Sequence, residues 1–243
     1  DRWERYDVWP PKKGFRDAKM YLTAGGGLSF SAPAAGVADG GVAAKYVSDP
    51  ANPIPYRHRP IQPTYGKGSK WRTWLVEDQR FVSSRKDLAN FSTPVLDHDV
   101  TVTGDVMADL FASTTGSDAD WVVKLIDVYP DNAEGEMAGY QLMIADEIFR
   151  GRYVKSFEKP EALVPGKVTE FKWSLHGVDH TFLKGHRIMV EVQSSWFPLY
   201  DRNPQTFVPN IMRASKKAYK AETMTIYGSV QYPSHLEFSV PAQ

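Results

Sequence analysis

The sequence predicts an all-β protein, a two-sheet antiparallel β-sandwich of jelly-roll type. Three observations support this fold class. Apolar residues alternate with polar residues along several segments, as they do in strands that bury one face. Aromatic residues make up 13% of the 243 residues, and 18 glycines and 17 prolines supply frequent turns. Segments with a helical period are scarce, and nothing resembles repeated strand–helix–strand units.

The central strands are the clearest elements of this pattern. From Asp99 to Thr114, every second residue is apolar or small. From Asp120 to Tyr129, both alternating sets are rich in apolar residues, which is typical of a strand covered on both faces. Turn-forming residues separate these segments from their neighbours. The other expected strands are Met20–Thr23, Thr169–Leu175, His186–Ser194, Met224–Tyr227 and Leu236–Val240.

Helical signal is confined to Ile211–Glu222, where we expect one or two turns with Asn210 as the N-cap. Residues 1–75 contain many glycines and prolines, so we expect them to form long loops that wrap the sandwich rather than a separate domain. On this interpretation residues 1–243 form one β-sandwich domain, a length that all-β domains often reach.

Composition excludes several classes of function. The chain has 29 Lys and Arg residues and 29 Asp and Glu residues, so its formal charge is zero. Nucleic acids and anionic membranes are therefore not expected as partners. No apolar run approaches the roughly 18 residues that span a bilayer. Cysteine is absent, which excludes disulfides, thiolate zinc sites and a cysteine nucleophile, and leaves the cellular compartment undetermined.

Motifs of catalysis are missing from the sequence. There is no G-x-S-x-G nucleophile elbow, and we predict no catalytic residue in this chain. The glycines Gly25–Gly27 precede a strand-like segment rather than a helix, so they predict a structural turn and not a phosphate loop. No cofactor is predicted.

Metal sites are also not predicted. His176 and His180 are four residues apart, but Gly177 lies between them and the segment is typical of a turn, so we interpret them as loop histidines. His186 begins a strand, and we expect it to hydrogen-bond within the fold. A structural calcium ion near Asp118 and Asp120 is a weaker alternative, because oxygen-rich loops suit that ion.

Two aromatic segments carry the candidate site residues. One is Trp71-Arg72-Thr73-Trp74, which follows the proline-rich segment that contains Pro55 and Tyr56. The other is the run from Ser194 to Pro204. Exposed aromatic rings can contact sugars or apolar ligands, but aromatic side chains also fill cores and domain interfaces. We favour the second interpretation and keep direct ligand contact open.

These and five other segments together resemble a known family, in the expected order and over almost the whole chain. They are WxxYxxWPP (3–11), YVSDPANP (46–53), TWLVEDQRF (73–81), DWVVKLIDVYP (120–130), FRGRY (149–153), LKGHRI (183–188) and SSWFPLYDRNP (194–204). The chain resembles the C-terminal, non-catalytic domain of the X-Pro dipeptidyl-peptidase and cocaine-esterase (CocE/NonD) class of serine hydrolases. Within that class it is most similar to α-amino acid ester hydrolases and glutaryl-7-aminocephalosporanic acid acylases.

The resemblance implies a galactose-binding-like jelly roll that follows an α/β-hydrolase catalytic domain in a longer parent chain. The catalytic Ser, Asp and His would lie in that preceding domain, which would be the partner of this one. The parent would cleave esters or amides, such as α-amino acid esters, β-lactam side chains or X-Pro peptides, through a serine acyl-enzyme. A homo-oligomeric parent is compatible with the resemblance, as is a bacterial periplasmic or secreted one.

The resemblance also implies roles for the two aromatic segments. The loop from Pro53 to Trp74 would rim the acyl pocket, with Pro55, Tyr56, Trp71 and Trp74 as the rim residues. A second group would form a structural or interface loop, namely Trp196, Phe197, Tyr200, Asp201, Arg202 and Asn203. We expect Arg202 to tie this loop to the sandwich, with contact to the catalytic lobe as the alternative. An independent carbohydrate-binding module is the alternative function.

Overall fold

The computed structural model describes residues 3–35 and 41–242, except for the side chain of Trp71. Eleven strands account for most of the regular structure in these ranges. They are β1 (Phe15–Thr23), β2 (Gly27–Ser29), β3 (Val42–Ser48), β4 (Leu88–Ser92), β5 (Val100–Thr114), β6 (Asp120–Val128), β7 (Gln141–Arg150), β8 (Thr169–Phe182), β9 (Arg187–Gln193), β10 (Glu222–Tyr227) and β11 (His235–Pro241).

Helical segments are short. They are α1 (Arg80–Ser83) and the 3-10 turns η2 (Trp71–Val76), η3 (Gly135–Met137), η4 (Gly151–Tyr153), η5 (Ile211–Arg213) and η6 (Lys216–Ala218). None of the helices in the described ranges has the length and apolarity that a membrane crossing requires.

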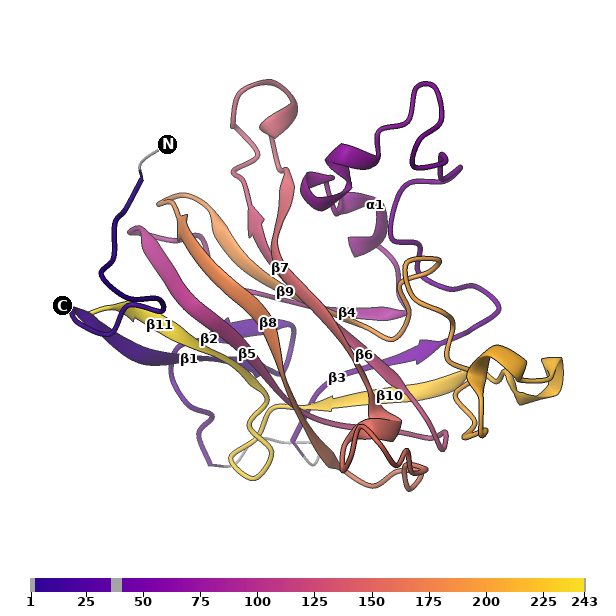
Figure 1. The fold of residues 1–243 in the computed structure, drawn as a ribbon. Coiled ribbons are helices and arrows are strands. Elements are labelled where there is room, and N and C mark those ends of the chain that lie inside the picture. The colour runs from indigo at the N-terminus through magenta and orange to yellow at the C-terminus, as the bar shows by residue number, and fades with distance from the viewer. Residues whose placement is uncertain (1–2, 36–40, 243) are drawn as a thin grey trace.

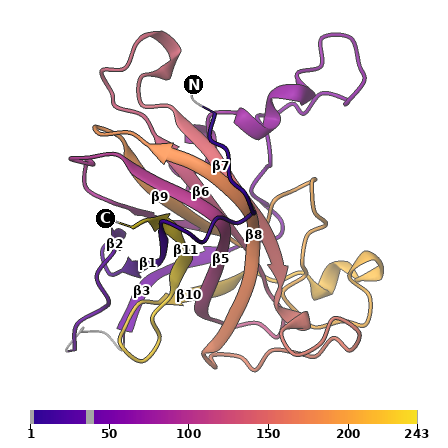
Figure 2. The same cartoon turned by 60° about the vertical axis from the view of Figure 1, so that its left-hand side comes forward.

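The strands form two layers (Figures 1 and 2). One layer contains β8, β5, β11, β1 and β2, with β10 and β3 continuing from the end of β5. The other contains β4, β9, β6 and β7. A single parallel bridge between Gly27 and Ser92 links the layers, and the remaining ladders are antiparallel. The predicted all-β sandwich is therefore confirmed.

Strand β6 is buried on both faces, as its sequence predicts. Its inner set, which includes Trp121 and Leu125, packs in the main core together with strands of the opposite layer. Its outer set, which includes Val122 and Lys124, is equally buried. Residues 53–83 and 194–203 cover this outer face, on the side of the molecule away from both termini (Figure 1).

The prediction of a turn at His176–His180 was wrong. Both histidines lie within β8, which continues to Phe182. The ladder with β5 shifts its register between Asp105 and Met107, and His176 adopts a φ of 69° there. The strand therefore absorbs an irregularity at Gly177 that resembles a break in the sequence.

Residues 1–75 contain more strand than expected. Besides a longer β1, and β2 where the sequence is strand-like after the glycines, they hold β3. β3 buries Ala43, Tyr46 and Ser48, and the three-residue spacing between Ala43 and Tyr46 breaks the alternation that indicates a strand. Residues 49–70 form a loop, as expected, and residues 53–70 of this loop belong to the cover over the outer face of β6.

Two local predictions are confirmed. Gly25 and Gly26 both adopt a φ of 77° in the turn between β1 and β2, a conformation that favours glycine. Asn210 caps a short helical segment, because its side chain accepts a hydrogen bond of 2.9 Å from the backbone N–H of Met212. That segment consists of the 3-10 turns η5 and η6.

Candidate functional site

The candidate site is the surface that two segments, remote in sequence, build over β6, β9 and β7. We call residues 53–83 the proline segment and residues 194–203 the aromatic run. Pro55 and Phe197 form an isolated parallel bridge between them. The backbone N–H of Tyr56 donates to the carbonyl of Phe197 at 3.1 Å, and that of Phe197 donates to Ile54 at 2.8 Å. The two segments therefore hold each other in place.

Aromatic rings fill the space beneath this surface. Trp196 is buried and packs with Val122 and Met143 on the outer face of the sheet. Trp74 contacts it edge-on at 6.1 Å between ring centroids, and Tyr56 contacts Trp74 edge-on at 5.8 Å. Tyr200 stacks on Trp196 at 6.2 Å. Trp196 is thus an interior side chain, whereas Tyr56, Trp74 and Tyr200 are only half-buried.

Trp71, another predicted rim residue, begins η2, and its side chain lies outside the described part of the structure. Pro55 is half-buried beside Phe197. The structure therefore brings Pro55 and Tyr56 together with Trp74 and the aromatic run.

A buried charged network lies under the cover. The ammonium group of Lys124 donates to Glu191 Oε1 at 2.8 Å and to Gln79 Oε1 at 3.0 Å, and it lies 5.1 Å from the Trp196 ring centroid. The side chains of Lys124 and Glu191 are completely buried. Because Lys124 lies on β6, its hydrogen bond to Gln79 fastens the proline segment to the sheet. Burial also raises the pKa of Asp146 to about 6, and the positive charge of Lys124 opposes that rise.

Sequence reasoning missed this network, although one signal was present. A lysine in the middle of a strand that is apolar on both faces must be paired where it is buried. Nothing in the sequence identified Gln79 and Glu191 as its partners.

The side of the cover carries a second polar group. The hydroxyl of Tyr200 donates to Glu147 Oε1 at 3.1 Å, and burial together with the Glu147 charge raises the pKa of Tyr200 to about 12. His176 Nε2 lies 2.9 Å from Glu147 Oε2 and is mostly exposed. Glu147 therefore connects the aromatic run to β8 in the other layer.

His186 forms the hydrogen bond expected from its position, since its Nδ1 lies 2.8 Å from Asp127 Oδ1. His180 Nε2 lies 3.0 Å from the other oxygen of the same carboxylate. No cluster of three or more His, Cys, Asp or Glu residues suited to a metal ion occurs within residues 3–35 and 41–242.

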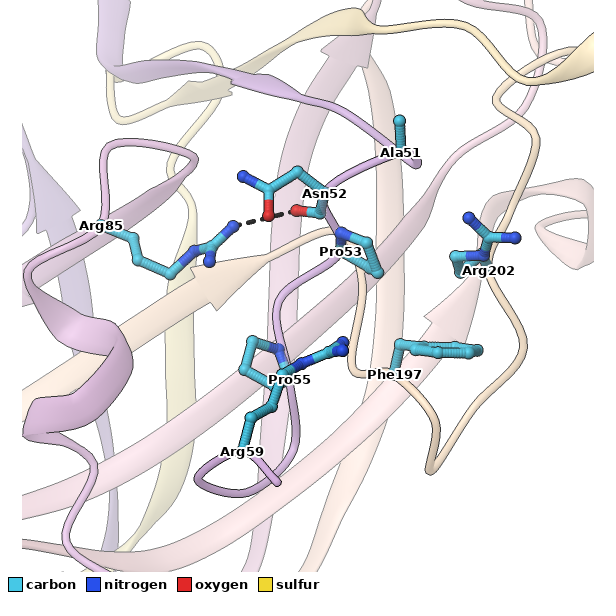
Figure 3. Close-up of a pocket in the computed structure, with 8 residues that line it drawn as sticks. All are labelled: Ala51, Asn52, Pro53, Pro55, Arg59, Arg85, Phe197 and Arg202. Carbon is cyan, nitrogen blue, oxygen red and sulfur yellow. Dashed lines mark hydrogen bonds between the residues drawn. The ribbon is translucent and has the colours of Figure 1, made fainter. Parts of the chain in front are cut away.

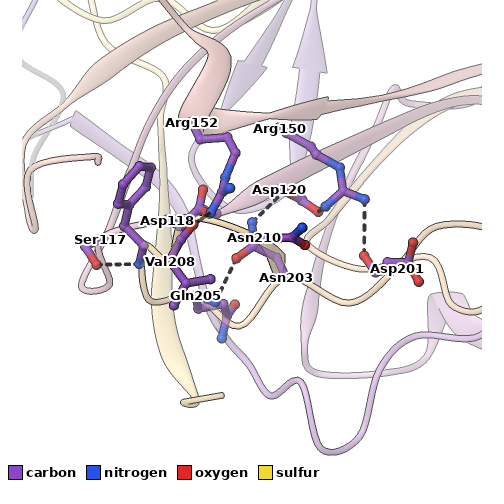
Figure 4. Close-up of polar contacts among 12 residues, drawn as sticks. Ser117, Asp118, Asp120, Arg150, Arg152, Asp201, Asn203, Gln205, Val208 and Asn210 are labelled. Atoms are coloured by element: carbon purple, nitrogen blue, oxygen red, sulfur yellow. Dashed lines mark hydrogen bonds and ion pairs between the residues drawn. The ribbon is translucent and has the colours of Figure 1, made fainter. Parts of the chain in front are cut away.

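The end of the aromatic run is fastened to the start of β6 (Figure 4). Asn203 donates to Asp120 Oδ1 at 2.8 Å. Arg150 pairs with Asp120 Oδ2 at 3.1 Å and donates to the backbone carbonyl of Asp201 at 3.3 Å. Burial raises the pKa of Asp120 to about 7, and Arg150 opposes the rise.

Asp118 has a comparable partner. The guanidinium of Arg152 donates twice to Asp118 Oδ2, at 2.9 and 2.7 Å. Because arginines occupy the carboxylates of both Asp118 and Asp120, the calcium alternative does not fit this geometry.

A hollow of about 490 Å³ opens between the two segments and is also lined by Ala51, Asn52 and Arg85 from just outside them (Figure 3). Arg202 donates to the carbonyl of Pro50 at 2.8 Å, and its guanidinium lies 5.4 Å from the Phe197 ring centroid. Arg85 pairs with Asp87 and donates to the carbonyl of Asn52 at 2.9 Å. The lining residues are Ala51, Asn52, Pro53, Pro55, Arg59, Arg85, Phe197 and Arg202.

Comparison with known proteins shows which family the chain belongs to. Residues 1–237 match the family model described as the X-Pro dipeptidyl-peptidase C-terminal non-catalytic domain. The cocaine esterase of Rhodococcus sp. (strain MB1 Bresler) is 33% identical over 244 residues, which cover 97% of this chain and 39% of the esterase. The chain therefore spans well under half the length of this relative.

Two solved structures are similar in both fold and sequence. An aminopeptidase from the marine sediment archaeon Thaumarchaeota archaeon matches with a TM-score of 0.94 and 50% identity, over 99% of this chain and 39% of that one. An α-amino acid ester hydrolase labelled with selenomethionine matches with a TM-score of 0.87 and 47% identity, over 92% of this chain and 36% of that one. By its sequence match over nearly its whole length, the chain belongs to the family of X-Pro dipeptidyl-peptidase C-terminal non-catalytic domains.

Proposed function

We propose that this chain is the accessory β-sandwich domain of a serine hydrolase that acts on esters or amides, and that it packs on an α/β-hydrolase catalytic domain of the same polypeptide. Family membership supports this proposal, because the family description is that of a non-catalytic C-terminal domain. The relatives are named as an esterase, an ester hydrolase and an aminopeptidase, and this chain covers 36–39% of each.

The observation that carries the proposal is the apolar surface of the cover. Leu75 and Val76 are 52% and 51% exposed in η2, next to Trp74. Leu199 is 39% exposed in the aromatic run, beside Tyr200. Groups of exposed apolar side chains on an ordered surface mark sites of protein contact. We assign this surface, the docking face, to the catalytic lobe.

The finer proposal concerns the acyl pocket. Prolines at positions 53, 55, 60 and 63 restrict the backbone in the first part of the proline segment, so that this part can hold one shape without a helix or strand. Pro55, Tyr56 and Trp74 come together at its surface, and the partly buried rings of Tyr56 and Trp74 are fixed by Trp196. Such a rigid apolar wall suits the acyl group of an α-amino acid ester, a β-lactam side chain or an X-Pro peptide.

Footprinting with hydroxyl radicals tests the docking face. We expect Leu75, Val76 and Leu199 to be strongly protected in the full-length protein relative to this chain alone. Phe157 and Val230 serve as matched controls, because they are 79% and 60% exposed and lie outside the cover. Equal labelling of the docking face in both samples would contradict the proposal.

The independent carbohydrate-binding module is tested separately. Titration of the chain with a panel of mono- and oligosaccharides should show no saturable binding. Saturation at millimolar concentration or below would favour that alternative.

A further inference from the structure

The hollow beside the docking face is unusually cationic for this protein. Three of its eight lining residues are arginines, and none is acidic. The chain as a whole has equal numbers of basic and acidic residues. Asp87 forms an ion pair with Arg85, whereas Arg59 and Arg202 form no ion pair within the described ranges. The hollow therefore has a surplus of positive charge.

Two of these guanidinium groups are fixed in place. Arg85 makes two hydrogen bonds to Asp87, at 2.8 and 2.6 Å. Arg202 is held by its hydrogen bond to the carbonyl of Pro50, and its guanidinium lies 5.4 and 5.1 Å from the ring centroids of Phe197 and Tyr219. Groups that are already ordered lose little entropy when a ligand binds.

Arg59 is the exposed one of the three arginines, and the backbone that carries it is held in place by Arg57. Two residues earlier, the buried Arg57 donates to Glu77 at 3.3 Å and to the carbonyl of Lys70 at 2.8 Å. Figure 3 shows Arg202 above the Phe197 ring and Arg59 to its left. The ring supplies an apolar wall beside two groups that offer paired N–H donors.

The nearest acidic residues along the chain do not neutralise the hollow. Asp49 accepts a hydrogen bond from the N–H of Ala51 at 2.8 Å and is outside the lining. Asp201 is exposed and is also outside the lining.

We propose that this hollow is a carboxylate-binding pocket, and that in the full-length protein it receives an acidic side chain of the catalytic lobe. Arginine matches the planar, two-oxygen geometry of a carboxylate better than any other side chain. Phe197 would pack against the methylene groups of the incoming residue. The choice of the catalytic lobe as the source of the carboxylate depends on the proposed docking face, because the hollow opens between the same two segments. A free carboxylate ligand has the same chemistry and must be distinguished by experiment.

Chemical modification of the full-length protein identifies the source of the carboxylate. Phenylglyoxal reacts with accessible guanidinium groups, and peptide mass mapping gives the rate at each arginine. Arg16 and Arg213 are exposed controls outside the hollow. If the pocket is occupied nine-tenths of the time, the rate at Arg59 falls about tenfold below that of the controls.

The outcomes of this measurement are distinct. Protection of Arg59 without any additive supports a side chain of the lobe. Protection only after addition of succinate overturns that occupant and assigns the pocket to a free carboxylate. Control-like reactivity under both conditions overturns the pocket altogether. If Leu75 and Leu199 are protected in the footprint while Arg59 stays reactive, this inference fails and the docking face stands.

Substitution of Arg59 shows whether its contact with the catalytic lobe depends on the guanidinium group or only on burial of the side chain. Arg59→Gln should lower the melting temperature of the full-length protein by about 1–3 °C, a small shift because this chain covers only 39% of a relative's length, and Arg59→Lys should lower it by less than half as much. Arg213→Gln is the matched control and should have no effect. Equal effects of the Gln and Lys variants would contradict carboxylate binding, as would the absence of any effect. Because Arg59 is exposed, these variants should fold normally.

Discussion

The buried network of Lys124 offers the sharpest test of how the cover is held. We consider Lys124→Met, which removes the ammonium group and keeps a side chain of similar length. Glu191 then remains completely buried without its cation, and Gln79 Oε1 loses its donor. Removing one partner of a buried ion pair typically costs about 3–5 kcal/mol. In a domain of this size, each kcal/mol lowers the melting temperature by roughly 2–4 °C, so the expected loss is about 6–20 °C.

Thermal unfolding of the chain, followed by circular dichroism, measures this effect. Lys155→Met is the matched control, because Lys155 pairs with Glu161 on the surface, where both side chains are more than half exposed. Such a pair contributes about 0–1 kcal/mol, so the control should change little. Lys124→Met/Glu191→Leu removes both charges, and such replacements are often neutral. The double variant should therefore recover most of the loss.

Two results would refute this reasoning. A shift below about 4 °C for Lys124→Met would show that the buried charge of Glu191 is compensated by other groups. A double variant as unstable as the single one would show that packing around Lys124, and not the pair, determines the stability.

Four further predictions follow from the same geometry. Arg202→Ala removes one charged hydrogen bond, to the carbonyl of Pro50, rather than a buried ion pair, so the melting temperature of the chain should fall by about 3–12 °C. A shift under about 2 °C would reject the expectation that Arg202 ties its loop to the sandwich. The pKa of Asp146 is raised to about 6, above its ordinary value near 3.9, so the folded state binds the proton more tightly and stability falls as pH rises from about 4 to about 6. Asp146→Asn should flatten that part of a pH series of thermal melts, and an unchanged slope would assign it to another group. In the full-length protein, Trp71→Ala and Trp74→Ala should lower kcat/KM for a bulky acyl substrate by about 10–150-fold and spare a small one; equal ratios near one would place the loop away from the pocket. Finally, a fluorophosphonate probe should leave this chain unlabelled, and stoichiometric labelling of a serine would contradict an accessory role.

The fold was predictable where burial is strong and regular. β6 is apolar on both faces, and this pattern correctly predicted a strand covered on both sides. β7 was missed because it is half-exposed along most of its length, so its two faces differ little in polarity. β8 was predicted too short, since Gly177 is typical of a turn and nothing local indicates that β5 pairs with the residues beyond it.

The candidate site was predictable only as separate segments. The aromatic runs were visible in the sequence, but the bridge between Pro55 and Phe197 joins residues more than 140 positions apart. Lys124 and its partner Gln79, which comes from a loop, are also far apart in the sequence. Such pairings depend on how the layers are assembled, and no local pattern encodes them. The docking face, the pocket rim and the carboxylate pocket therefore remain proposals.

The mutual support of the proline segment and the aromatic run has a consequence for local unfolding. Neither segment contains a strand in the described ranges, and the backbone contacts between them are centred on one bridge. They should therefore open together, as one cooperative unit, at a lower free energy than the sandwich beneath them. Opening would expose the buried pair of Lys124 and Glu191 to water. A partner that binds only the closed form would suppress this opening, so amide exchange at Tyr56 and Phe197 would report its presence.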